Sequence, residues 1–172
     1  MISLDRPLRH LAWADALLFA DLAALPPEAL AARYSPSAWT VGALAQHIVG
    51  GAEWYRYCLT GEQWTDLVDP AGPDDVIALG THLAGLDADL LGQAALPDAM
   101  VEFTDEEGRR TAWRSTILTQ ACLHSIEHRA QIACALEACG FAPIVLDDYD
   151  LWAFEAHERD VASPGGGGED SP

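Results

Sequence analysis

Apolar residues recur at helical spacing in four segments of the chain. In residues 8–24 they return every three or four positions, which is typical of a helix with one buried face. Similar patterns predict three more helices, over residues 40–60, 74–91 and 112–139. Thr40 is a suitable N-cap for the second helix, and Gly140 is a suitable stop for the last one. The pattern therefore predicts a mostly helical protein.

A different pattern precedes the last helix. Val101 and Phe103 alternate with polar residues beside the acidic turn at residues 105–108, which predicts a two-stranded hairpin. The fold class expected is all-α: a four-helix bundle with a short β-hairpin in the connection before the last long helix. The connections around residues 25–39, 61–73 and 92–111 are longer than tight turns need, so the pattern leaves the order of the helices in space open.

The length of 172 residues suits one domain with a sizeable core. We expect residues 1–162 to form the helical domain. Residues 163–172 consist mainly of Gly, Ser and Pro, with one Glu and one Asp, a composition that predicts a disordered tail.

Charge restricts the partners. The chain has 27 acidic and 9 basic residues and a net charge of −18, which repels phosphate backbones and anionic membranes. We therefore expect neither a nucleic acid nor a membrane as partner, and a small molecule as substrate. No apolar run is long enough to cross a bilayer, and residues 1–9 lack the pattern of a secretory signal, so a cytoplasmic location is expected.

Two histidines stand four residues apart in the last helix, at His124 and His128. Residues at this spacing lie about 40° apart around a helix, so both imidazoles point to the same side and can reach one metal ion. Gln131 lies on the same stripe, where a purely structural helix would place an apolar residue. A bound metal with its water, or solvent in an open cleft, would both satisfy these polar groups.

A metal bound by His124 and His128 would take a third ligand from one of the other histidines. His47 has the best claim, because it lies well inside the second helix and one turn before Gly50 and Gly51. Each glycine costs about 1 kcal/mol relative to alanine in a helix. The pair therefore indicates that space is needed there, either above a metal or for close packing of two helices.

The opposite side of the last helix is also largely uncharged, apart from Arg129. A helix that is apolar on two sides is covered on two sides. Residues 147–154 or a second subunit could supply this cover, and we favour a homodimer.

In these features the chain resembles the DinB-like (YfiT-like) family of metal-binding four-helix bundle proteins. The first helix carries HLAWADALL, and the last helix carries the H-x-x-x-H pair followed by Gln131 and the Gly140 stop. The matching stretches are residues 10–18, 38–55 (AWTVGALAQHIVGGAEWY), 118–132 (LTQACLHSIEHRAQI) and 140–152 (GFAPIVLDDYDLW). Their order and spacing carry the resemblance, which spans residues 10–152.

The resemblance implies that His47, His124 and His128 bind one divalent metal. Three imidazoles leave coordination positions open; zinc or nickel is favoured, and iron or manganese also fits such ligands. Relatives of this kind include transferases and isomerases that use low-molecular-weight thiols. We therefore expect a metal-dependent enzyme that activates a small thiol or water, of the thiol S-transferase, isomerase or hydrolase type. Glu127, Gln131 and Tyr55 are candidates for proton transfer or substrate contact, and no catalytic residue is assigned.

Two alternatives remain. Residues 124–128 also read as H-x-x-E-H, a pattern of some zinc peptidases with Glu127 as general base. Such an enzyme needs a further acidic ligand well downstream and a large chamber, and only a short chain follows His128. The other alternative is a non-enzymatic metal-binding stress-response protein whose histidines hold the helices together.

Overall fold

The structure is a computed structural model and describes residues 3–142 and 144–162. The mostly helical fold and the hairpin before the last long helix are confirmed. The elements, in chain order, are α1 (Asp5–Ala24), the 3-10 helix η1 (Pro27–Ala31), α2 (Val41–Thr60), α3 (Pro73–Ala94), β1 (Met100–Asp105), β2 (Gly108–Trp113), α4 (Arg114–Ala138), the 3-10 helix η2 (Leu146–Tyr149) and α5 (Leu151–Ala162). The predicted tail, residues 163–172, lies outside the described residues.

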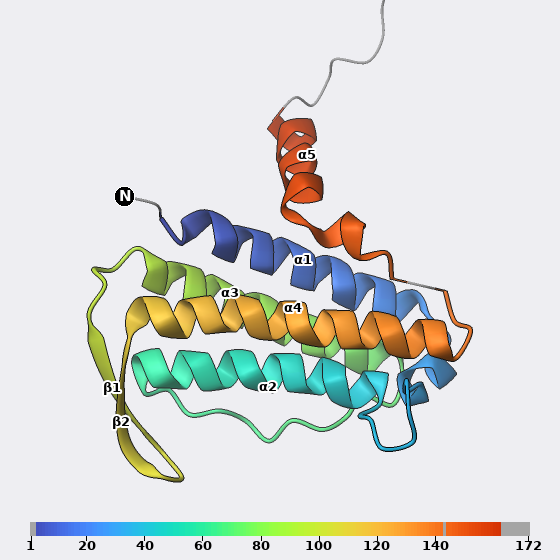
Figure 1. The fold of residues 1–172 in the computed structure, drawn as a ribbon, viewed down its shortest axis with the longest axis horizontal. Coiled ribbons are helices and arrows are strands. Elements are labelled where there is room, and N and C mark those ends of the chain that lie inside the picture. The colour runs from blue at the N-terminus through green and yellow to red at the C-terminus, as the bar shows by residue number, and fades with distance from the viewer. Residues whose placement is uncertain (1–2, 143, 163–172) are drawn as a thin grey trace, which may run out of the picture.

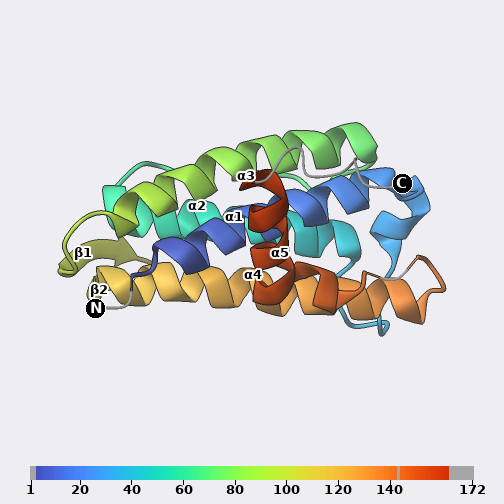
Figure 2. The ribbon, with the colours of Figure 1, turned by 90° about the horizontal axis from the view of Figure 1, so that it is seen from above.

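The four long helices, α1 to α4, lie side by side, and the hairpin closes one end of them (Figure 1; Figure 2). Helix α1 packs along α3, and α2 packs along α4. The connection after α2 runs back along that helix before α3 begins, so α2 and α3 point in the same direction (Figure 1). This return accounts for the length of the connection between α2 and α3, while the other two long connections contain η1 and the hairpin. It also shows that α2 and α3 are parallel, which the pattern left open.

The helix ends follow from local chemistry. The Oγ1 atom of Thr40 accepts a hydrogen bond of 3.1 Å from the backbone N–H of Ala43, as expected of an N-cap. Helix α2 ends at Gly61 and α4 ends just before Gly140, with φ angles of 78° and 74°. Only glycine adopts this left-handed conformation without steric cost, so both helices stop where a glycine is available.

The core between the long helices consists mainly of leucine and other aliphatic side chains. One side chain from each helix illustrates it: Leu18, Leu44, Leu83 and Leu136 are all at most 2% exposed. In α1 and α3 the buried residues recur at helical spacing, so the spacing in the sequence predicts the buried faces of these two helices. Burying side chains of this size contributes about 1.5–3 kcal/mol each before the cost of ordering the chain.

The sequence pattern missed a fifth helix. Helix α5 follows η2 and stands against α1, pointing away from the other helices (Figure 1). Tyr149 and Phe154 are buried, and the Nε2 atom of His10 lies 2.7 Å from the carbonyl oxygen of Tyr149. The segment therefore packs back over α1. Helix α5 is short, and Phe154 is its one buried residue. It therefore carries little of the periodic signal by which the long helices are recognised.

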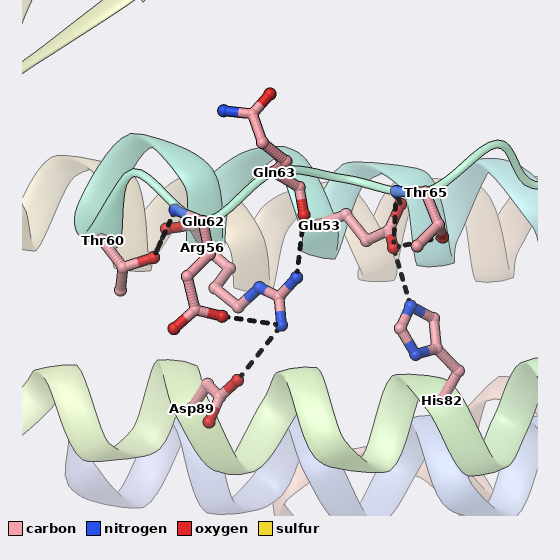
Figure 3. A network of polar contacts seen from close by, with 8 residues as sticks. All are labelled: Glu53, Arg56, Thr60, Glu62, Gln63, Thr65, His82 and Asp89. Atoms are coloured by element: carbon pink, nitrogen blue, oxygen red, sulfur yellow. Dashed lines mark hydrogen bonds and ion pairs between the residues drawn. The ribbon is translucent and has the colours of Figure 1, made fainter.

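A buried carboxylate fastens the connection between α2 and α3. Glu53 is 1% exposed and accepts hydrogen bonds from the backbone N–H of Thr65, at 3.3 and 3.2 Å, and from its hydroxyl at 2.7 Å (Figure 3). His82 of α3 donates to the same carboxylate from Nε2, at 2.8 Å. Arg56 adds a bond to the carbonyl oxygen of Gln63. One side chain of α2 thus holds both the returning connection and α3.

Within the described residues, no helix is long and apolar enough to span a membrane.

Replacing Glu53 tests this attachment. We expect Glu53→Ala to lower the free energy of unfolding by about 1–3 kcal/mol, because Thr65 and His82 lose their shared acceptor and the buried side chain leaves a gap. Urea unfolding followed by circular dichroism measures the loss. Glu62→Ala is the matched control, since Glu62 is largely exposed and pairs only at the surface with Arg56. Its effect is expected to stay within about 0.5 kcal/mol, and equal losses in the two variants would contradict this role of Glu53.

Candidate metal centre

The structure brings together the three histidines that the sequence singles out. His47 of α2 meets His124 and His128 of α4, and their candidate ligand atoms all lie within 4.8 Å of one another. The Nε2 atoms of His47 and His124 are 3.1 Å apart. The three ring centroids are 4.4 to 4.8 Å apart. This is a cluster of three nitrogen donors from two helices.

The helix pairing explains the cluster. His124 and His128 point the same way because four residues make about one turn of α4. Helix α2 packs along this face of α4, and His47 is on the side of α2 that meets it. The third histidine is therefore supplied by tertiary packing, across 77 residues of chain.

Gly51 makes room for one of the rings. A β-carbon placed on Gly51 would lie 2.7 Å from Nδ1 and 3.1 Å from Nε2 of His124, and closer still to Cε1. No side chain larger than hydrogen fits there without moving the imidazole. Gly50 differs, because the nearest atom to its β-carbon would be Nε2 of Gln46 at 3.9 Å. Of the two glycines, only Gly51 is required by close approach, and what it approaches is a histidine of the cluster.

The surroundings keep two of the imidazoles neutral. Burial, together with smaller effects of the neighbouring His128 and His47, lowers the pKa of His124 to about 4. Burial also lowers the pKa of His47, with a smaller contribution from His128 in the same direction and an opposing one from Glu127. A neutral imidazole has a free lone pair for a metal, so these two rings are ready to bind at neutral pH without losing a proton.

Neighbouring side chains orient and cover the cluster. Nδ1 of His128 lies 2.9 Å from Oε1 of Gln131, which leaves Nε2 of that ring for a metal. A histidine ligand is commonly oriented in this way through its second nitrogen. The indole of Trp39 packs edge-on against His47 and stacks on His128, at centroid distances of 4.6 and 6.3 Å. Trp39 is 52% exposed, so it forms a wall that reaches the surface.

The other two candidates lie differently. Tyr55 presents its ring to His124 in an edge arrangement, with centroids 5.7 Å apart. Glu127 is exposed on α4 and is not part of the three-histidine cluster. Of the three residues named from the sequence, Gln131 thus contacts a histidine through a hydrogen bond, Tyr55 packs beside one, and Glu127 faces outward.

Sequence reasoning missed a second polar group, on the adjacent face of α4. Ser125 and Arg129 each follow a histidine of the cluster by one residue, so they point about 100° away from it. Both bind Asp15 of α1: the Ser125 hydroxyl donates to its Oδ1 atom, and Nη2 of Arg129 lies 3.3 Å from the same oxygen. All three side chains are at most 3% exposed. The clue in the sequence was Asp15 within an apolar stripe.

Asp87 of α3 adds a further buried carboxyl to this group and is 2% exposed. Burial, helped by the nearby Asp15 and opposed by Arg129, raises its pKa to about 8. Burial likewise raises the pKa of Asp15 to about 6, against the effect of Arg129 and Ser125. Near neutral pH, Asp87 therefore favours its protonated form more than Asp15 does, and the buried ion pair belongs to Asp15 and Arg129.

The donor set fits a divalent transition metal. Three imidazole nitrogen donors suit zinc or nickel, and three ligands leave at least one position for a water or substrate. His47 and His124 are half-buried, so the cluster is neither sealed nor on an open surface. This arrangement resembles reactive metal sites more than closed structural ones.

The two neighbouring glycines of α2 provide a matched test. We expect Gly51→Ala to weaken binding of Zn²⁺ about tenfold or more, because the methyl group displaces the His124 ring from its orientation. Gly50→Ala is expected to leave the affinity unchanged and to stabilise the helix by about 0.5–1 kcal/mol. Competition titration with a chromophoric chelator measures the affinity. Equal affinities for the two variants would contradict the proposed fit of Gly51 to His124.

Comparisons with known proteins agree with this fold. A search of curated proteins gave no match. A solved structure of a DinB-like protein from Bacillus cereus ATCC 10987 is similar, with a TM-score of 0.60 and 17% sequence identity over 80% of this chain and 94% of that one. At this identity, the likeness concerns the fold. The sequence model of the DinB family matches residues 1–160, and the chain therefore belongs to the DinB family.

Proposed function

We propose that this protein binds one divalent metal ion through His47, His124 and His128 and uses it to activate a small thiol or a water molecule. The observation that carries the proposal is the convergence of three imidazoles from α2 and α4, with their ligand atoms within 4.8 Å. Membership of the DinB family and the resemblance to metal-binding relatives support it. Zinc or nickel is the preferred ion, and iron or manganese also accepts such ligands.

The residues around the cluster have distinct roles in this proposal. A bound divalent ion supplies the Lewis acidity that turns a water or a thiol into a nucleophile near neutral pH. Gln131 holds the His128 ring in orientation. Trp39 walls one side of the cluster and excludes water from part of it. The phenol of Tyr55, whose pKa is raised chiefly by burial, stays protonated and is a hydrogen-bond donor beside His124.

The reaction class follows from what the site offers. Three protein ligands leave a coordination position for an exogenous nucleophile. Burial raises the pKa of the half-buried thiol of Cys122 and of the buried thiol of Cys58 to about 11. These two cysteines are therefore poor nucleophiles of their own. A nucleophile delivered by a low-molecular-weight thiol or by water is the better choice. Thiol S-transfer, the related isomerisation and hydrolysis are the reactions that we propose for this site.

A non-enzymatic role in metal binding is the alternative. Its support is that the cluster joins α2 to α4, so an ion held by all three rings would cross-link the two helices. In that case the ion would serve stability. The homodimer expected from the sequence also stays a proposal; Leu123 and Ile126 are exposed apolar residues on the outer side of α4 that such a contact would cover.

Metal analysis of purified variants tests the three-histidine site. The wild type is expected to carry one divalent ion per chain, and His47→Ala, His124→Ala and His128→Ala are expected to lose it, because two imidazoles hold such an ion much less firmly than three. His82→Ala is the control, since His82 binds Glu53 and lies outside the cluster. Retention of stoichiometric metal by His47→Ala would overturn the site.

Chelation separates the enzymatic proposal from the structural alternative. If the ion is catalytic, removing it with a chelator leaves the protein folded, with only a modest fall in melting temperature. The metal-loaded protein then accelerates addition of a small thiol to an electrophile, or hydrolysis of an activated ester. Calorimetry and product analysis measure the two effects. Unfolding on chelation, combined with no accelerated reaction of either kind, would favour the structural role.

A further inference from the structure

A small internal cavity lies between all four long helices. Its polar lining comes from each of them: Asp15 of α1, Tyr55 of α2, Asp87 of α3, and His124 and Ser125 of α4. The space open to the centre of a water-sized sphere is about 10 Å³, which is close to the minimum needed for one water molecule. The cavity therefore connects the buried acidic group with one histidine of the metal cluster.

Asp87 has an unmet need for a hydrogen bond. Among the described residues, its Oδ1 atom is buried with no hydrogen-bond partner. Asp15 differs, because its Oδ1 atom already accepts from Ser125 and Arg129. Leaving a buried polar atom without a partner costs free energy, and ordered water is the usual partner where protein atoms supply none. The Asp87 carboxyl in the cavity wall is thus the group that needs a further hydrogen-bond partner.

His124 has the complementary need. Its Nε2 atom faces Nε2 of His47, so Nδ1 is the nitrogen left to donate a hydrogen bond when Nε2 binds a metal. His128 meets the same need with Gln131, but the described residues give His124 no such acceptor on Nδ1. A metal-bound histidine almost always donates its second N–H to a carboxylate, a carbonyl group or a water.

We propose that this cavity binds one ordered water, which accepts a hydrogen bond from Nδ1 of His124 and is held by the carboxyl group of Asp87. Asp87 is then a positioning residue: it orients a metal ligand through the water and does not touch the ion. The inference rests on the proposed metal site, and it adds a buried residue of α3 to a centre otherwise built from α2 and α4. It also accounts for a carboxyl buried in the core without a protein partner.

The size and charge of the cavity favour water over a second cation. Asp15 is already neutralised by Arg129 at 3.3 Å, and only one carboxyl group in the lining is left without a partner. A cation would need several oxygen ligands in a space suited to a single water. A water needs only two to four polar partners, which Asp87, His124 and the nearby hydroxyl groups supply.

Co²⁺ titration of full-length variants tests the proposal. Asp87→Leu is nearly isosteric and cannot hold the water, so we expect its Co²⁺ affinity to fall about 10- to 100-fold and its visible absorption spectrum to change. Asp87→Asn keeps a polar group that holds the water and is expected to restore affinity and spectrum to near wild type. Asp89→Asn, which removes a surface charge from the same helix, is expected to behave as wild type. Wild-type affinity in Asp87→Leu would overturn the inference.

A second measurement guards against misfolding of the leucine variant. In the Zn²⁺-loaded protein labelled with ¹⁵N-histidine, the Nδ1 proton of His124 is expected to be hydrogen-bonded. Its chemical shift is expected to stay near the wild-type value in Asp87→Asn and Asp89→Asn, and to move in Asp87→Leu protein that circular dichroism shows to be folded. An unmoved shift in folded Asp87→Leu overturns the connection between Asp87 and His124. A wild-type protein that binds neither Co²⁺ nor Zn²⁺ overturns the proposed function as well, whereas tight binding that is indifferent to Asp87 overturns this inference alone.

Discussion

The contact between α2 and α4 at Gly51 is the constraint on which the candidate centre depends. The imidazole of His124 lies against the backbone of α2, where any β-carbon would collide with it. This fit sets how closely the two helices approach and therefore whether His47 reaches the pair on α4. The glycine weakens α2 as an isolated helix, and the packing across the interface must offset that cost. Gly51 thus lowers the intrinsic stability of α2 and allows the His124 ring to lie against the backbone of that helix.

Two neighbouring faces of α4 each contact another helix through a pair of polar residues. One face carries His124 and His128, and the next carries Ser125 and Arg129, each pair one turn apart. The second pair holds Asp15 of α1 in the core. A rotation of α4 about its axis would disturb both faces at once. It would break the buried ion pair with Asp15 and would turn His124 and His128 away from His47. Separating the charges of a buried ion pair is strongly destabilising, because it leaves them without a partner in the core. The pair between Asp15 and Arg129 therefore opposes rotation of α4 and keeps its histidines facing α2.

Much of the fold could be predicted from the sequence, because it rests on local signals. The four long helices follow from apolar spacing, their ends from Thr40, Gly61 and Gly140, and the hairpin from alternation around an acidic turn. The parallel course of α2 and α3 could not be predicted, since it depends on how a proline-rich connection attaches to Glu53. The pairing of Asp15 with Arg129 was hidden for a related reason: neither residue shows, by its spacing, which partner it meets in the fold.

The separation along the chain of the two helices that carry the histidine cluster has a consequence during synthesis. His47 belongs to α2, but its partners in α4 follow 77 and 81 positions later in the sequence, after the crossover, α3 and the hairpin. A nascent chain that has emerged only as far as α3 contains one histidine of the cluster and no means of holding an ion with it. The centre is therefore assembled late, when α4 has been made and has packed against α2. The order of the helices along the chain thus makes the proposed metal site a feature of the nearly finished protein.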